Sequence, residues 1–174
     1  TGSCGKISRE EALALAKDTM RMALDALDSE GLSNIHICPE TMGKVNQLGT
    51  LDEVLELCLL DERLIPCIDF GHLNARDLGC LKDFSDYENI FIKIRDRLGT
   101  DRLKSFHSHF SKIEYTTGGE KRHLTFEDTV YGPDYEPVME LVLKYGCDPT
   151  FICESAGTQA EDAKKMKDYY YSIV

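Results

Sequence analysis

Six side chains that can bind metal ions recur along the chain at intervals of roughly one strand and one helix. All six lie at or just beyond the end of a short apolar run: Glu40, Asp69, His72, His107, His123 and Glu154. Where strands alternate with helices, the carboxyl ends of the strands face one rim, and side chains placed there converge. Carboxylate and imidazole ligands without thiolates suit Zn²⁺, Mn²⁺ or Mg²⁺. The spacing therefore predicts a metal-dependent enzyme.

Two kinds of reaction fit such a set of ligands. A metal ion with an open coordination position binds water and lowers its pKa, and two ions clamp the attacking and leaving oxygens of a phosphodiester. The same ligands can polarise a sugar carbonyl and hydroxyl for isomerisation. The ligand types alone leave both reactions open.

Each carboxylate also has a simpler structural explanation when it is taken singly. Glu40 or Glu154 at the end of a strand could cap a helix or lie in solvent. Asp69 and His72 are stronger candidates, because both follow the same apolar run at a spacing that puts them on one rim. Chance explains any one of these residues more readily than it explains the whole set.

The histidines differ in how strongly the sequence supports them. Of His107 and His109, we expect only one to face the cavity, and we assign His107 to it, with His109 behind it or on the surface. His123 lies in a polar segment and by itself would be interpreted as an exposed histidine. His36 lies within an apolar run and is most simply a packed core residue.

Apolar periodicity divides the chain into helices that alternate with strands. Helices are expected near residues 8–29, 51–62, 85–98, 134–145 and 158–170, and strands at 34–38, 64–70, 103–107 and 150–153. Four capping boxes mark helix starts, at Ser8 with Glu11, Thr50 with Glu53, Ser85 with Glu88, and Thr158 with Glu161. A long polar loop is expected from the third strand to about residue 132, and loops of that length are more often functional than idle.

Strands separated by helices predict a parallel sheet, because parallel neighbours need a crossover. An open doubly wound sheet and part of a (βα)₈ barrel both fit. A whole barrel usually needs about 250 residues, and the chain has 174. It opens without methionine on a loop that leads into a helix. We therefore expect a single domain over residues 1–174, the C-terminal half of a (βα)₈ barrel that lacks about four N-terminal strands.

Composition narrows the classes of partner. The net charge of −11 opposes non-specific binding to nucleic acid, although Lys104, Lys112, Lys121 and Arg122 could line a local phosphate-facing groove. The seven cysteines form no C-x-x-C pair, so neither a zinc ribbon nor a disulfide framework is indicated. No membrane span or signal segment is evident, and we expect a soluble cytoplasmic protein.

Short motifs along nearly the whole chain resemble the endonuclease IV family of barrel enzymes, which belongs to a wider xylose isomerase-like group with sugar isomerases and epimerases. The matching segments are Ile37–Lys44, Leu48–Glu53, Cys67–His72, Phe106–Lys112, Lys121–His123 and Ile152–Ser155, and Thr1–Ser3 resembles the loop after the family's fourth strand. The segments occur in the family's order and at similar spacing. The resemblance implies the C-terminal half of a barrel.

The resemblance also implies roles at a three-zinc site. Glu40 would bridge two ions, His72 and His123 would serve the third ion, and the remaining site would be completed by Asp69, His107 and Glu154. We expect Glu40 and Glu154 to be the catalytic residues.

The chain departs from the family pattern in two ways. Lys121 stands where the family has an aspartate, so the third ion lacks its usual carboxylate unless Glu120 replaces it. Two further family histidines belong to strands that we expect to be absent, so these residues alone would not complete the three-metal site.

Three hypotheses follow from these observations. The first is a metal-dependent phosphodiesterase that cleaves damaged DNA beside abasic sites, a DNA-repair activity. The second is a sugar or sugar-phosphate isomerase or epimerase, favoured by the acidic balance and the altered third site. The third is an inactive fragment or binding module that self-associates to cover the missing half-barrel. We slightly favour the first hypothesis, because His72 and His123 retain the pair of histidines that the resemblance assigns to the third metal ion.

Overall fold

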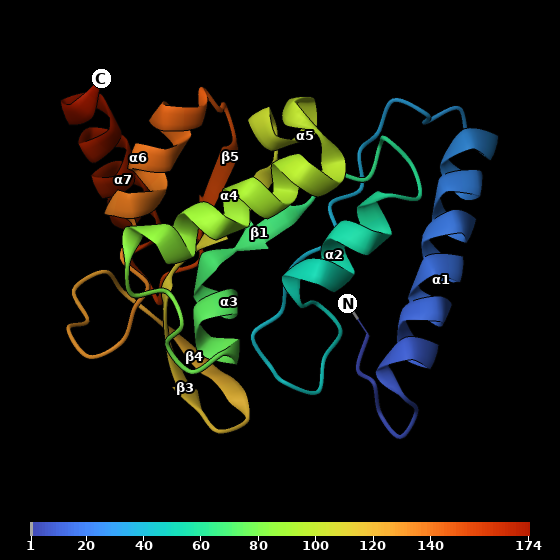
Figure 1. Cartoon of the computed structure of the whole chain (residues 1–174), viewed down its shortest axis with the longest axis horizontal. Coiled ribbons are helices and arrows are strands. Elements are labelled where there is room, and N and C mark those ends of the chain that lie inside the picture. The colour runs from blue at the N-terminus through green and yellow to red at the C-terminus, as the bar shows by residue number, and fades with distance from the viewer. Residues whose placement is uncertain (1) are drawn as a thin grey trace.

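Parallel strands form the sheet, as the alternation of helices and strands predicts (Figure 1). The computed structural model describes residues 2–174. Thr1, which belongs to the segment that resembles a family loop, lies outside the described residues. Residues 37–40 run parallel to β1, where Glu40 bridges to Cys67. The strands of the sheet lie in the order β1 (Cys67–Asp69), β2 (His107–Phe110) and β5 (Thr150–Cys153). The prediction of an α/β fold with parallel strands is confirmed.

Helices follow one another along the sheet. Figure 1 shows α1, α2, α4 and α6 in succession across the molecule, with α7 beside α6, and each contacts the next. None of the helices that the structure describes is long and apolar enough to cross a membrane. The helices are α1 (Arg9–Ser29), α2 (Leu51–Cys58), α3 (Phe70–Arg76), α4 (Phe84–Leu98), α5 (Thr100–Lys104), α6 (Glu136–Tyr145) and α7 (Gln159–Ile173).

The first two helices begin at the predicted capping boxes. The Ser8 hydroxyl accepts from the Glu11 amide at 3.1 Å, while the Glu11 carboxylate accepts from the Ser8 amide at 2.9 Å. Thr50 and Glu53 make the same reciprocal pair at 3.2 and 2.9 Å. These caps involve groups only three residues apart, so the local sequence suffices to predict them.

The other two predicted capping boxes do not form, although Thr158 is the N-cap of α7 as expected. Helix α4 begins with a box formed by Asp83 and Asp86, and Glu88 instead accepts from Lys144 at 2.7 Å on α6. At the start of α7, the Thr158 hydroxyl donates to Asp162 at 2.8 Å. A Ser or Thr followed by an acid three residues later is common by chance, so the pattern alone does not locate a helix start.

The third strand begins later than predicted. Residues 103–107 were expected to form a strand, but α5 covers Leu103 and β2 begins only at His107. Leu103 and Phe106 are both buried, with 1% and 0% of their surface exposed. A short apolar run signals burial without distinguishing a helical turn from a strand.

Helix α3 follows β1 directly and was not predicted. Every residue from Phe70 to Arg76 is buried, so the segment has no polar face whose spacing could indicate a helix. Asp69 ends β1 and caps α3, because its carboxylate accepts from the His72 amide at 2.7 Å. This cap holds the side chains of Asp69 and His72 near each other. Helix α2, in contrast, ends at Cys58, shorter than the predicted range of 51–62.

The segment predicted as a long polar loop contains a β-hairpin. Strand β3 (Lys112–Thr116) pairs antiparallel with β4 (Gly119–Leu124), and the register shifts between Glu114 and Tyr115. The hairpin contacts α3, and Figure 1 shows it extending away from the sheet next to that helix. Its polar composition reflects its exposure and does not exclude strands.

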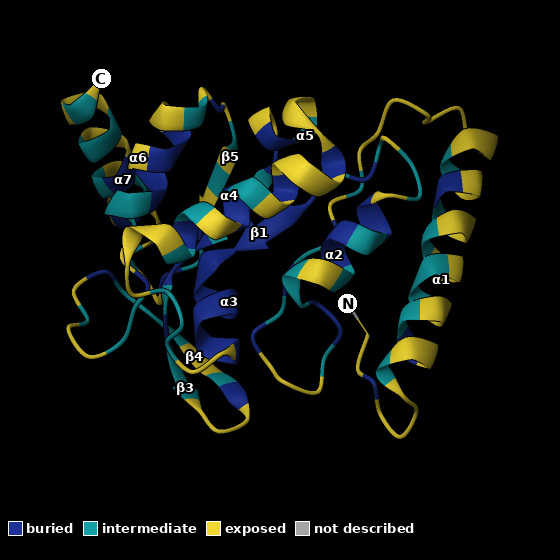
Figure 2. Cartoon of the chain, viewed as in Figure 1, coloured by how far each residue is buried: buried dark blue, intermediate teal, exposed yellow. Residues whose placement is uncertain are grey.

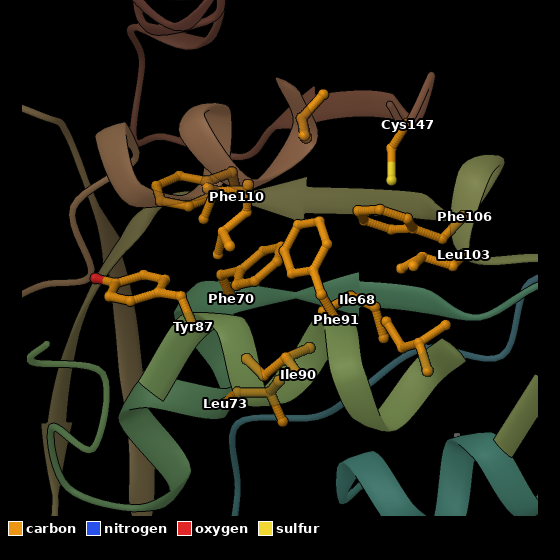
Figure 3. Packing of buried hydrophobic residues seen from close by; sticks show 14 of the residues in the cluster. Ile68, Phe70, Leu73, Tyr87, Ile90, Phe91, Leu103, Phe106, Phe110 and Cys147 are labelled. Carbon is orange, nitrogen blue, oxygen red and sulfur yellow. The ribbon is translucent and has the colours of Figure 1, made fainter. Parts of the chain in front are cut away.

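The core lies between the sheet and the helices. Figure 2 shows buried residues concentrated in β1 and α3, whereas α1 is largely exposed, with Ala12 and Leu24 as its buried residues. Aromatic rings pack together in this core (Figure 3). They include Phe70, Phe91, Phe106 and Phe110. This packing fixes the ends of β1 and β2, from which the candidate site is built.

The start of α2 should contribute stability that depends on pH. Burial would raise the pKa of Glu53, but hydrogen bonds from Arg9 and from the amides of Gly49 and Thr50 outweigh burial and lower the pKa to about 2. The stabilisation is therefore full above the unfolded-state pKa near 4.5 and is lost as the pH falls towards 2. We expect Glu53→Gln to lower the free energy of unfolding by about 2 kcal/mol at pH 6.

Urea unfolding of the wild type and the Glu53→Gln variant at several pH values tests this expectation. The difference between the two proteins should shrink below pH 4.5. Glu10→Gln, an exposed change in the first turn of α1, serves as the control and should cost less than about 0.5 kcal/mol at any pH. A difference for Glu53→Gln that stays constant with pH would contradict the assignment.

Candidate metal centre

Four neighbouring parallel segments end at one rim, and each contributes an ionisable side chain there. The ligand atoms of these side chains, which we call the rim cluster, all lie within 4.8 Å of one another: Glu40, Asp69, His109 and Glu154. The register explains the convergence, because Asp69 on β1 lies opposite His109 on β2. Glu154 follows the last residue of β5, and its amide donates to Phe110 at 3.0 Å.

Hydrogen bonds and charges tie the rim cluster together. His109 Nδ1 lies 3.1 Å from Glu40 Oε1 and 3.5 Å from Glu154 Oε1. Burial would raise the pKa of Glu40, but the hydrogen bonds from His109 and His72 outweigh burial and lower it to about 2. The hydrogen bond with Glu40 in turn raises the pKa of His109. Without a bound ion, the histidines compensate the charge of the carboxylates.

Asp69 is the residue that most clearly fits a cation. Its side chain is fully buried, and burial raises the pKa of its carboxyl group. One oxygen accepts from the His72 amide, whereas Oδ2 lies 3.4 Å from His72 Nδ1 and has no hydrogen-bond partner among residues 2–174. A buried oxygen without a partner is costly, and a divalent ion in the rim cluster would satisfy it. The ligand set therefore fits a divalent metal.

A second group of three side chains lies beside the rim cluster. The ligand atoms of His72, Glu120 and His123, which we call the hairpin cluster, also lie within 4.8 Å of one another. Glu120 stands between the two imidazoles, 3.5 Å from His72 Nε2 and 3.7 Å from His123 Nε2. His123 Nδ1 is held at 2.8 Å from the Ser111 hydroxyl. Burial would lower the pKa of His72, but Glu40 and Asp69 outweigh it and raise the pKa to about 9.

A bulge in the hairpin brings Glu120 into this cluster. On β4, Arg122 pairs with Glu114, but the next pair along the hairpin joins Glu120 to Tyr115, so Lys121 is an extra residue. In a regular strand, residues three apart point to opposite faces. The extra residue removes this alternation and places Glu120 on the same face as His123. Glu120, rather than Lys121, is therefore the carboxylate beside the two histidines.

Close backbone contacts also hold Glu120 in place. The Glu120 amide donates to Gly43 O at 2.9 Å. Gly119 has a φ of +90°, and a Cβ atom there would lie only 2.2 Å from Gly43 O. Only glycine tolerates both this backbone conformation and this approach. The contact joins the hairpin to the segment after Glu40, and no local sequence pattern predicts it.

His107 does not join the carboxylates, and the expectation that only one of the two histidines faces the cavity is wrong. Side chains two residues apart on a strand point to the same face, so His107 and His109 share one face, with ring centroids 5.2 Å apart. His107 lies opposite Cys67, one step back from the rim, whereas His109 lies opposite Asp69. The alternation of a strand predicts that both histidines share a face, and the register alone places His109 in the cluster.

The remaining predicted residues do come together at the rim. The two clusters contain five of the six predicted side chains: Glu40, Asp69, His72, His123 and Glu154. They also contain two residues that were not among the six, His109 and Glu120. The sequence did indicate Glu120, but only as a replacement for the family aspartate. His36, expected in the core, is exposed.

The basic residues do not form the predicted groove. Lys121 and Arg122 both pair with Glu114 on the neighbouring strand, and Lys112 donates to the Asp128 carbonyl at 2.7 Å. Lys104 lies on α5, which precedes β2 and is therefore at the opposite end of the strands from the rim. Three of the four basic side chains therefore already pair with a carboxylate or donate to a backbone carbonyl.

Comparison with known proteins identifies the family. Residues 1–171 match the model of the xylose isomerase-like TIM barrel family. An uncharacterized protein of Methanocaldococcus jannaschii is 35% identical over 164 residues, which cover 94% of this chain and 59% of the relative. The chain thus spans less than two thirds of the length of that relative. The family includes endonuclease IV and sugar isomerases, and its members often bind divalent metals. The chain belongs to the xylose isomerase-like TIM barrel family.

Proposed function

We propose that the rim and hairpin clusters bind divalent metal ions, with Zn²⁺ preferred, and that the protein hydrolyses phosphodiester bonds in damaged DNA. One observation carries the proposal: two carboxylates lie between the clusters. Glu40 Oε1 is 3.1 Å from His109 and 3.4 Å from His72. Glu154 lies 3.5 Å from His109 and 4.0 Å from His123. Carboxylates that can bridge adjacent ions are typical of centres that clamp both oxygens of a phosphodiester.

The chain's own residues would divide the work according to their burial. Bound ions would supply a water molecule of lowered pKa and charge for the leaving oxygen. Asp69, fully buried, would hold its ion in place. Glu40 would orient His109 through its Nδ1 atom at 3.1 Å, whereas the Thr41 carbonyl, 2.9 Å from Nδ1 of His72, would orient His72. Glu154, whose side chain is 36% exposed at the rim, is the carboxylate that a substrate can reach, and we assign it to accept the proton of the attacking water.

The proposal includes a barrel of which these residues form one part. Among the residues that the structure describes, residues 37–40 pair only with residues 64–67 and β5 pairs only with β2. Both outer edges of the sheet are thus open to further strands. The greater length of the relative supports further strands outside this chain. The additional histidines that the family resemblance implies would belong to those strands.

A nicking assay tests the proposed hydrolase. The full-length protein with Zn²⁺ or Mn²⁺ should cut a duplex that carries one abasic site, and it should leave the matched intact duplex uncut. Cleavage should disappear with a chelator and fall about 100-fold or more in the Glu154→Gln variant. Absence of cleavage by protein that has been shown to contain metal would overturn the proposal.

A sugar isomerase or epimerase is the second candidate, and the electrostatics favour it. The net charge is −11, and Glu114 engages both Lys121 and Arg122, so little positive charge remains free beside the hairpin cluster. A small neutral sugar does not require such charge. Turnover of a ketose or ketose phosphate by metal-loaded protein, without nicking, would establish this alternative.

Substitution of Glu120 tests metal binding by the hairpin cluster separately from the rim cluster. We expect Glu120→Gln to weaken binding of the ion in this cluster by about 10–100-fold, because the amide removes the only carboxylate that the cluster contains. Lys121→Gln is the matched control, since Lys121 pairs with Glu114 and lies outside the cluster. Calorimetric titration with Zn²⁺ measures both variants. Equal effects of the two changes would argue against the role given to the bulge.

A further inference from the structure

A third group of ligand side chains lies one step below the rim, and two of its three members, Cys67 and His107, have no part in the proposed hydrolysis. Cys67, His107 and His109 place their ligand atoms within 4.8 Å of one another. The group differs in kind from the other two clusters, because it contains a thiol and no carboxylate. Its position and chemistry point to a separate site.

The register of β1 and β2 explains why these side chains meet. Cys67 lies directly opposite His107, and Asp69 lies directly opposite His109. Residues two apart on a strand share a face, so Cys67 and His107 form a layer beneath Asp69 and His109. The two histidine rings meet edge to face with centroids 5.2 Å apart. The three side chains are therefore held by neighbouring strands of the sheet.

The surroundings favour a cation at this place. Cys67 is 2% exposed, Glu40 lies opposite it on the neighbouring segment, and Asp69 lies two residues further along β1. His107 and His109 are only partly buried, so their ring nitrogens are not enclosed by the core. A metal ion deprotonates a thiol that binds it, which gives the site one thiolate and two neutral imidazoles.

We propose that Cys67, His107 and His109 form a binding site for a thiophilic divalent ion, of which Zn²⁺ is the physiological example. One sulfur and two nitrogen ligands select soft and borderline ions over Mg²⁺ and Mn²⁺. Three protein ligands leave a fourth tetrahedral position open. Because His109 also belongs to the rim cluster and a neutral imidazole binds one ion, an ion at this site competes with the rim for His109.

Cobalt is a suitable probe because it reports thiolate ligation directly. A Co²⁺ ion bound to a thiolate gives a near-ultraviolet charge-transfer band, whereas an ion bound only by carboxylate and imidazole does not. Titration of the reduced, metal-free protein with Co²⁺ should produce this band. The band reports only the Cys67 thiolate, which belongs to neither the rim nor the hairpin cluster, so it is read separately from nicking activity.

Three variants decide the assignment. Cys67→Ser should abolish the band, and His107→Gln should weaken Co²⁺ binding at least 10-fold although all seven thiols remain. Cys38→Ser removes the exposed cysteine and should leave the band unchanged. Far-ultraviolet circular dichroism of the metal-free variants checks their folding. If Cys67→Ser folds poorly, His107→Gln still tests the site, because His107 is only partly buried. Absence of the band in the wild type, its persistence in Cys67→Ser, or normal affinity in His107→Gln would overturn the proposal.

Discussion

Replacing Asp69 with asparagine should lower the affinity of the rim cluster for Zn²⁺ by about 100-fold or more, and the nicking rate should fall with it. The carboxylate is fully buried, and its Oδ2 atom has no hydrogen-bond partner among residues 2–174, so a bound ion is its natural partner. Asparagine keeps an oxygen for the His72 amide but loses the charge. Because the variant no longer buries a carboxyl group, its metal-free form should be as stable as the wild type or about 1 kcal/mol more stable.

Asp162 provides the matched control for this experiment. It is also buried, with 1% of its surface exposed, but its carboxylate accepts from the Phe126 amide at 3.1 Å and from the Thr158 hydroxyl at 2.8 Å. Asp162→Asn should therefore cost about 1–2 kcal/mol of stability and leave Zn²⁺ affinity unchanged. Calorimetry and urea unfolding measure the two quantities. If Asp69→Asn lost stability and kept its Zn²⁺ affinity, Asp69 would be a structural cap only.

Truncating Phe91 to alanine should cost about 4 kcal/mol of unfolding free energy. Phe91 is fully buried on α4 and packs at centroid distances of 5.6 Å from Phe106 and 6.3 Å from Phe70 (Figure 3). Its removal leaves a cavity between α4 and the strands that carry the rim residues. The free energy of unfolding of such domains is only about 5–15 kcal/mol, so the expected loss is a large fraction of it.

Urea unfolding followed by circular dichroism measures the effect of Phe91→Ala. Phe91→Leu, which retains most of the volume, should cost about 1 kcal/mol and keeps the comparison possible if the alanine variant does not fold. Phe84→Ala tests the same substitution at a residue of α4 that is 38% exposed and should cost less than about 1 kcal/mol. Similar losses at Phe91 and Phe84 would contradict the packing described for the core.

The elements that could be predicted from the sequence are those whose signals are local. Ser8 with Glu11 and Thr50 with Glu53 start α1 and α2 where expected, because the groups that pair lie within one helical turn. Strand β5 was predicted with its observed bounds, Thr150–Cys153. In contrast, α3 is buried on all sides and its sequence lacks the periodicity that marks a surface helix.

Within the candidate site, the same distinction separates the residues that could be predicted from those that could not. Glu40, Asp69 and Glu154 stand at the ends of apolar runs, and the parallel order of the strands suffices to bring them to one rim. Glu120 reaches its place only through the bulge at Lys121 and the contact with Gly43, which lies far away in the sequence. Strand alternation predicts that His107 and His109 share one face, but only the register with β1 places His109 beside Asp69.

The sequence by itself therefore determined the alternation of helices and parallel strands, the rim at which the carboxylates gather, and the type of ligand gathered there. These features follow from periodicity and chain order, which are properties of neighbouring residues. The tertiary structure alone decided that His109 and Glu120 join the clusters and that Cys67 meets His107. Those contacts depend on the register between strands and on close backbone approach, which are set by packing between segments distant in the chain.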